Sequence, residues 1–239
     1  MKAVFEKDYD LRPSDFDQNE NLLPSAILDI FQDAAGRHSV VMGAGIHDLS
    51  GKGLIWVVVK SRFEIVGKAH MYQTVRVKTW PLKPSRVTFR RECLLSDLDG
   101  NPLVRGSTEW VVVDKIKRRI TLGDGIYNIT DDEYLTDLNF EDKILKVSNF
   151  ETFDDGFRIL PRFSDIDING HVNNTKYADY VLDAIIQNEN GLNINYFQID
   201  YHKEVLKDDM LRIHIKKEND EILALGKVES DIMFSCRIK

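Results

Sequence analysis

The sequence of 239 residues is poor in cysteine and proline and contains no long hydrophobic run. Its two cysteines, Cys93 and Cys236, fit no metal-binding or redox spacing, so we expect both to be reduced strand residues. No segment is apolar enough to cross a bilayer, and the first residues lack a signal-peptide core. These absences predict a cytoplasmic protein without membrane insertion. The net charge of −7 argues against a general nucleic-acid binder.

Two signatures of common hydrolases are also missing. No Gly-x-Ser-x-Gly segment occurs, which argues against a serine hydrolase. No group of histidines and cysteines has the spacing of a metal site, so we expect neither a metal nor another cofactor. With 43% hydrophobic and 30% charged residues, the composition is that of a folded globular protein.

The stretch 164–184 carries the candidate chemistry. Asp167, Asn169 and His171 stand at alternate positions, and the apolar residues after them change to helical spacing. We therefore expect His171 at the start of a helix, where free backbone N–H groups suit an oxyanion. Gly170 would let a substrate approach the backbone closely. A turn that merely caps the helix explains the same residues, so the motif by itself leaves both interpretations open.

Residues 14–34 repeat this stretch without a gap. The positions in common include Asp17 with Asp167 and Asn19 with Asn169. Asn21 stands where the second copy has His171, so only the second copy keeps a titratable side chain there. A repeat at this offset predicts two similar halves packed together, with chemistry in the second.

Each half reads as one helix followed by several strands. We expect strands at 4–11, 54–66, 74–80, 86–97 and 103–114, at 157–163, and from 194, 211, 222 and 232, and helices around 27–35 and up to about 187. The segment 123–155 carries ten acidic residues against two lysines. It predicts a solvated linker, 124–155, between an N-terminal domain, 1–123, and a catalytic C-terminal domain, 156–239.

Four segments resemble the acyl-acyl carrier protein (ACP) thioesterases of bacteria and plants. They are 54–58, 110–113 with 117–119, 165–174 and 201–204. The resemblance runs over nearly the whole chain and implies an α+β double hotdog fold, in which each of two tandem domains wraps an antiparallel sheet around a long helix. That fold agrees with the repeat.

The resemblance also implies that Asp167, Asn169, His171 and Glu204 are catalytic. Spacing alone would leave Glu204 at the surface, paired with a neighbouring lysine, because isolated carboxylates at strand ends are usually exposed. Many plant members carry a cysteine directly after this glutamate, but the residue here is Val205. Water activated by His171 and Glu204 is therefore the expected nucleophile, and the sequence leaves open which of the two is the base.

The first half, freed from catalysis, is expected to hold the acyl chain. The candidate substrate-binding residues are Ile27, Phe31, Ala34 and Ala35 on the first helix, with Gly170 and Val172 beside the thioester. Ordinary core packing explains the helical residues equally well. ACP is acidic, so its binding needs a basic patch. The candidates are Lys83, Arg86, Arg90 and Arg91, and Lys115, Lys117, Arg118 and Arg119.

The expected function is hydrolysis of fatty acyl-ACP, which releases a free fatty acid and ends chain elongation, by a monomer or homodimer. An acyl-CoA thioesterase of broader specificity and a non-catalytic acyl-binding hotdog protein remain as alternatives. A hotdog hydratase is less consistent with the motif, because those relatives carry a different histidine loop.

Overall fold

The computed structural model describes residues 3–122, 125–186 and 192–239. The strands are β1 (Phe5–Asp10), β2 (Leu54–Ile65), β3 (Thr74–Pro81), β4 (Thr88–Ser96), β5 (Pro102–Asp114), β6 (Arg119–Ile120), β7 (Phe157–Ile159), β8 (Tyr196–Tyr201), β9 (Leu211–Glu218), β10 (Glu221–Val228) and β11 (Asp231–Ile238). The α-helices are α1 (Pro24–Val41), α2 (Ile46–Ser50) and α3 (Lys176–Ile186). The expected strands and the two long helices are confirmed, whereas the short helix α2 was not expected. The end expected for the second helix, near 187, lies outside the described residues.

The strands form one continuous antiparallel sheet in the order β1-β3-β4-β5-β2-β8-β11-β10-β9-β7, with β6 paired to β5. The two halves meet where β2 pairs with β8, and Lys60 lies opposite Asp200. Phe63 and Phe197 stack at this junction with ring centroids 5.3 Å apart, and both are fully buried. The predicted α+β double hotdog is confirmed, and its two sheets join edge to edge.

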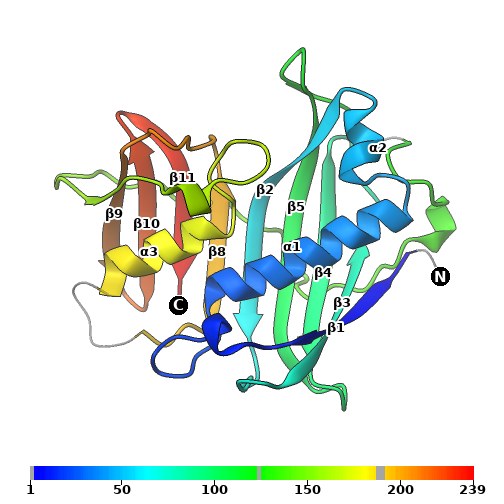
Figure 1. Ribbon diagram of the computed structural model, residues 1–239, viewed down its shortest axis with the longest axis horizontal. Coiled ribbons are helices and arrows are strands. Elements are labelled where there is room, and N and C mark those ends of the chain that lie inside the picture. The colour runs from blue at the N-terminus through cyan, green and yellow to red at the C-terminus, as the bar shows by residue number, and fades with distance from the viewer. Residues whose placement is uncertain (1–2, 123–124, 187–191) are drawn as a thin grey trace.

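Both long helices lie on the same face of this sheet, α1 across the first half and α3 across the second (Figure 1). Their apolar stripes enter a common core with the inner face of the sheet, because one stripe of each helix must be removed from water. Pro24 stands at the first turn of α1, where its missing N–H costs nothing, and Gly43 follows the helix with φ +71°.

The acidic segment between the halves, residues 125–155, lies along polar side chains of the sheet and is not a freely solvated linker. We call this segment the strap. Lys60 donates to the carbonyl oxygen of Ile144 at 2.7 Å, and the N–H of Val147 donates to Asp200 at 2.8 Å. Val147 is fully buried, whereas the side chain of Asp142 is 69% exposed. The prediction of solvation is therefore right for this charged side chain and wrong for the backbone and apolar side chains that anchor the segment.

Within the described residues, none of the helices is long and apolar enough to cross a membrane. Cys93 and Cys236 are buried and free on their strands, as expected.

Candidate active site

The second copy of the repeat folds into a tight turn that its own backbone closes. The N–H of Asp167 donates to the carbonyl oxygen of His171 at 2.8 Å, and Ile166 bridges to Val172. Gly170 has φ +85°, a conformation that glycine adopts without strain, and no other atom lies within 4 Å of the position that a Cβ would take. The turn therefore leaves open space at Gly170.

Asp167 organises this turn. Its Oδ1 accepts the backbone N–H of Asn169 at 2.8 Å and that of His171 at 3.4 Å. Its Oδ2 accepts the Asn169 side-chain amide at 3.2 Å. The carboxylate thus fixes both the backbone of the turn and the orientation of Asn169.

His171 and Glu204 meet beside the turn. Nε2 of His171 lies 3.1 Å from Oε2 of Glu204, and the two side chains are 29% and 47% exposed, so water reaches the pair. The neighbouring backbone holds them together, since the N–H of Val172 donates to the carbonyl oxygen of Val205 at 2.9 Å. Lys203 pairs with Asp231 instead of with Glu204. The simple surface pairing suggested by spacing is therefore wrong for this lysine.

Sequence reasoning missed the role of Tyr177. Its hydroxyl oxygen accepts the backbone N–H of Val205 at 3.2 Å, which ties the residue after Glu204 to α3. Burial raises the pKa of Tyr177, so the phenol stays neutral. The only sequence signal was its place in the helical stripe, and this also fits ordinary packing.

The helix start differs from the expectation. α3 begins at Lys176, and Asn173 shapes the turn before it by accepting the N–H of Thr175 at 3.2 Å. His171 therefore lies in the turn ahead of the helix and not on its first residue.

The candidate substrate-binding residues fall into two groups. Gly170 is open, whereas Val172 is buried in the core, so its side chain does not face the turn's open side. On α1, Ile27, Ala34 and Ala35 are buried as well. Phe31 borders a cavity of about 10 Å³ that Asn174 and Tyr201 also line, from the second half. This volume holds about one water molecule, so an acyl chain would have to displace packed side chains.

The first copy forms the same turn without the histidine. Oδ1 of Asp17 accepts the N–H groups of Asn19 and Asn21, both at 2.8 Å. Glu20 takes the place of Gly170 and also has a positive φ, +60°. The predicted repeat is therefore confirmed in backbone geometry, and the turns differ in their titratable groups.

One of the two candidate basic patches is only partly exposed, since Lys83 and Arg86 face solvent but Arg90 is partly buried and Arg91 is buried. Arg90 donates to Glu92 at 2.6 Å and to the strap, and Arg91 is only 2% exposed. Lys83 pairs with Asp131. The second group is exposed on the turn between β5 and β6, and consists of Lys115, Lys117, Arg118 and Arg119.

This basic turn follows β5 at the end of the sheet where the chain also leaves β8 toward Glu204; β2, β5 and β8 lie beside one another in Figure 1. Leu54 at the start of β2 pairs with Asp114 at the end of β5, and β8 runs antiparallel to β2. The chain therefore leaves β5 and β8 at the same end.

A helix wrapped by an antiparallel sheet, present twice and joined edge to edge, defines the class of tandem hotdog proteins. Solved structures share this fold. An acyl-ACP thioesterase from Bacteroides thetaiotaomicron is 22% identical, with a TM-score of 0.84 over 99% of this chain and 97% of that one. The 12:0-ACP thioesterase from Umbellularia californica is 21% identical, with a TM-score of 0.85 over 99% and 96% of the two chains.

Family models place the chain more narrowly. The acyl-ACP thioesterase N-terminal domain matches residues 2–129 and the C-terminal domain matches residues 151–234. The chain belongs to the acyl-ACP thioesterase family.

Plant relatives are similar over most of this chain. The chloroplastic oleoyl-ACP thioesterase of Coriandrum sativum is 25% identical over 88% of the chain and 62% of its own length. The chloroplastic palmitoyl-ACP thioesterase of Cuphea hookeriana is 26% identical over 76% and 46%. The chain thus spans roughly half of the length of these relatives.

Proposed function

We propose that the protein hydrolyses the thioester of a fatty acyl chain carried by ACP, releasing a free fatty acid and ending chain elongation. The observation that carries this proposal is the contact of 3.1 Å between His171 and Glu204 beside the open Gly170. Membership of the family supports it, as do the names of the plant relatives.

In the proposed mechanism, His171 and Glu204 activate a water molecule that attacks the thioester carbonyl. A thiolate is a good leaving group, because the pKa of a thiol is about 8.5, so little acid assistance is needed. Asn169, fixed through its amide by Asp167, keeps its side-chain oxygen for the water.

The backbone N–H groups of Asn169, Gly170 and His171 already donate to Asp167. The N–H groups of Val172, Asn173, Thr175 and Lys176 donate elsewhere as well. The oxyanion would therefore be stabilised mainly by the partial positive charge at the start of α3.

The first half supplies the acyl pocket in this proposal. Phe31 borders the small cavity that also touches Asn174 and Tyr201, so a chain leaving the thioester would enter beneath α1. Ile27, Ala34 and Ala35 lie deeper along the same helix and would limit its length. Since the junction of β2 and β8 lies within one chain, a monomer has both halves of the site. The cytoplasm stays the predicted compartment.

ACP is proposed as the carrier in place of coenzyme A because of the exposed basic turn. Lys115, Lys117, Arg118 and Arg119 face solvent at the catalytic end of the sheet, where an acidic carrier would dock. Electrostatic docking of this kind raises the association rate and weakens with salt.

The test compares hydrolysis of one acyl chain on ACP and on coenzyme A across a salt series. We expect ACP to be preferred at low salt and the preference to shrink near 1 M salt, where the Debye length is about 3 Å. Lys115→Glu combined with Arg118→Glu should raise KM for acyl-ACP and leave acyl-CoA hydrolysis unchanged. Lys216→Glu, on β9, is the control. Equal use of both carriers at every salt concentration would favour a general acyl-CoA thioesterase, and no turnover would favour an acyl-binding protein.

A further inference from the structure

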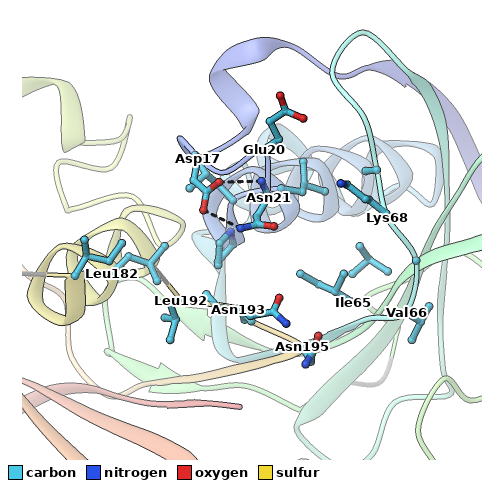
Figure 2. A pocket seen from close by; sticks show the side chains of 18 residues that line it. Asp17, Glu20, Asn21, Ile65, Val66, Lys68, Leu182, Leu192, Asn193 and Asn195 are labelled. Atoms are coloured by element: carbon cyan, nitrogen blue, oxygen red, sulfur yellow. Dashed lines mark hydrogen bonds between the residues drawn. The ribbon is translucent and has the colours of Figure 1, made fainter. Parts of the chain in front are cut away.

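A cavity of about 390 Å³ lies between the two halves (Figure 2), at the end of the sheet opposite to Glu204. It is placed there because β2 and β8 are antiparallel, so the segments that follow them leave at opposite ends. Ile65 and Val104 line it from the first half, and Leu182 and Ile186 line it from the second. Its volume and its largely apolar wall are typical of small-molecule pockets.

The cavity is the first-half counterpart of the candidate active site. Its polar end is the first copy of the turn, in which Asn21 stands where the second copy has His171. Lys68 is the third residue after the end of β2, just as Glu204 is the third residue after the end of β8. An amide and an ammonium group thus take the places of a histidine and a carboxylate.

The backbone fixes the position of Lys68. The N–H groups of Val66 and Gly67 both donate to the carbonyl oxygen of Leu103, at 2.9 and 3.1 Å. A Cβ on Gly67 would lie only 2.7 Å from a backbone oxygen at the start of β5, so this close approach requires glycine. Lys68 forms no ion pair or hydrogen bond through its side chain within 3–122, 125–186 and 192–239. Its ammonium group points toward Asn21 (Figure 2).

Three charged side chains, Asp17, Glu20 and Lys68, line the polar end of the cavity, and they differ in how freely they can bind a ligand. The carboxylate of Asp17 is occupied by the backbone N–H groups of Asn19 and Asn21 and by the Asn21 amide. The side chain of Glu20 points away from the apolar wall (Figure 2). Asp17 keeps its negative charge, but its acceptor atoms are engaged within the turn. Lys68 is therefore the charged side chain of the three that can bind a ligand, and its ammonium group favours an anionic one.

We propose that this cavity binds a free fatty acid and does not turn over. Its carboxylate would lie on Lys68 and the Asn21 amide, and its hydrocarbon tail would lie between Ile65 and Leu182. A carboxylate with one apolar tail matches both ends of the cavity, and no imidazole is available here to activate water. The ligand is the product class of the proposed function, but its binding rests on the lining of the cavity and needs no turnover.

The site is located by photolabelling. Decanoic acid with a diazirine at the end of its tail is irradiated with the protein, and labelled residues are identified by mass spectrometry. We expect labels on the residues that follow β2 or on Leu182 and Ile186. Labels confined to the catalytic turn and to 204–206 would overturn the proposal, as would the absence of specific labelling. The experiment is repeated with His171→Ala, so that failure of hydrolysis and failure of this site are distinguishable.

Affinity is measured by calorimetry with decanoate. Lys68→Glu should weaken binding at this site at least tenfold, whereas Lys216→Glu, a charge reversal on β9, should leave it unchanged. Val66→Trp provides a second variant that tests the cavity without touching the core, since Val66 is 45% exposed at the rim. It should also abolish labelling there. Unchanged affinity in both variants contradicts the proposal. Decyltrimethylammonium is the charge-reversed probe, and binding as tight as that of decanoate would contradict the role given to Lys68.

Discussion

Tyr177 shows how one hydroxyl group supports the pair of candidate catalytic side chains. It accepts the N–H of Val205, directly after Glu204, and its ring packs against Tyr201 and Phe234. The ring therefore packs in the core, and the hydroxyl oxygen fixes the backbone that follows β8.

We therefore predict that Tyr177→Phe keeps the fold and lowers kcat by roughly ten- to hundredfold, because small displacements of catalytic groups are costly. KM should change little, since the substitution leaves the surface of the site intact. Steady-state kinetics on acyl-ACP separate the two parameters. Tyr196→Phe is a matched control, because Tyr196 lies at the start of β8, away from Glu204, and its hydroxyl donates to Gln198. An unchanged kcat would show that the Tyr177 hydroxyl does not position Glu204.

The two cysteines are predicted to be chemically inert in the folded protein. Burial raises the pKa of Cys93 to about 12 and that of Cys236 well above its ordinary value, so neither forms a thiolate near neutral pH. Iodoacetamide at pH 8 should leave both unmodified and activity intact, whereas the unfolded chain should be alkylated twice, as mass spectrometry would show. Loss of activity upon alkylation of the native protein would contradict hydrolysis by water alone.

At the scale of elements, the repeat places two aspartates at equivalent helical positions with opposite environments. Burial opposes ionisation of Asp33, but hydrogen bonds from Lys7, Tyr9 and Arg37 outweigh it and lower the pKa of Asp33 to about 2. These bonds tie β1 to α1. Burial, reinforced by Asp179, instead raises the pKa of Asp183.

Asp33→Asn should therefore destabilise the protein at pH 7, by about 1 kcal/mol once solvent screening of this 40% exposed side chain is allowed for. The contribution of Asp33 is present above pH 3.8 and is lost as the pH falls toward 2. Asp183→Asn should instead stabilise the protein at pH 7. The raised pKa of Asp183 means that its ionisation opposes folding at any pH above the ordinary pKa of an aspartate. Denaturant unfolding at pH 7 and pH 3 measures both, and a stabilising Asp33→Asn would refute the assignment.

Two residues of the strap differ strongly in burial although they are only two positions apart. Val147 is fully buried and Leu145 is 68% exposed on the same segment. Val147→Asp should cost about 3 kcal/mol, because it places an unpaired carboxylate beside Asp200, whereas Leu145→Asp should change stability by less than about 0.5 kcal/mol. Equal effects in urea unfolding would show that the strap does not pack as described.

Local patterns predicted the elements well and their long-range environment poorly. Alternation found the strands, and the aligned repeat found both turns, because these signals lie within short windows. The environments of Arg90 and Arg91 were missed, because nothing in their neighbourhood shows that the strap covers Arg90 or that His38 of α1 lies against Arg91. Charges on a strand look solvent-facing until the segment that covers them is known.

At the scale of the whole molecule, the β2–β8 pairing places the two copies of the turn at opposite ends of one sheet. No short window of sequence reveals that pairing, because its partners lie more than a hundred residues apart, as Lys60 and Asp200 do. For the same reason, the sequence pointed to the candidate catalytic turn and not to the cavity beside its counterpart. His171 was found from its motif and from the unequal repeat, whereas Glu204 was found only through family resemblance, because spacing alone placed it at the surface beside a lysine.

The most direct test of the account measures single-turnover hydrolysis of acyl-ACP by His171→Ala, Glu204→Gln and Asn169→Ala, with Asn19→Ala as the matched variant in the first copy. We predict that the loss of either acid–base group lowers the rate by about 10²–10⁴-fold, with melting temperatures close to that of the wild type. Asn169→Ala should lower it as well, and Asn19→Ala should leave it unchanged. Wild-type rates in His171→Ala and Glu204→Gln, or an equal loss in Asn19→Ala and Asn169→Ala, would contradict catalysis by the second half.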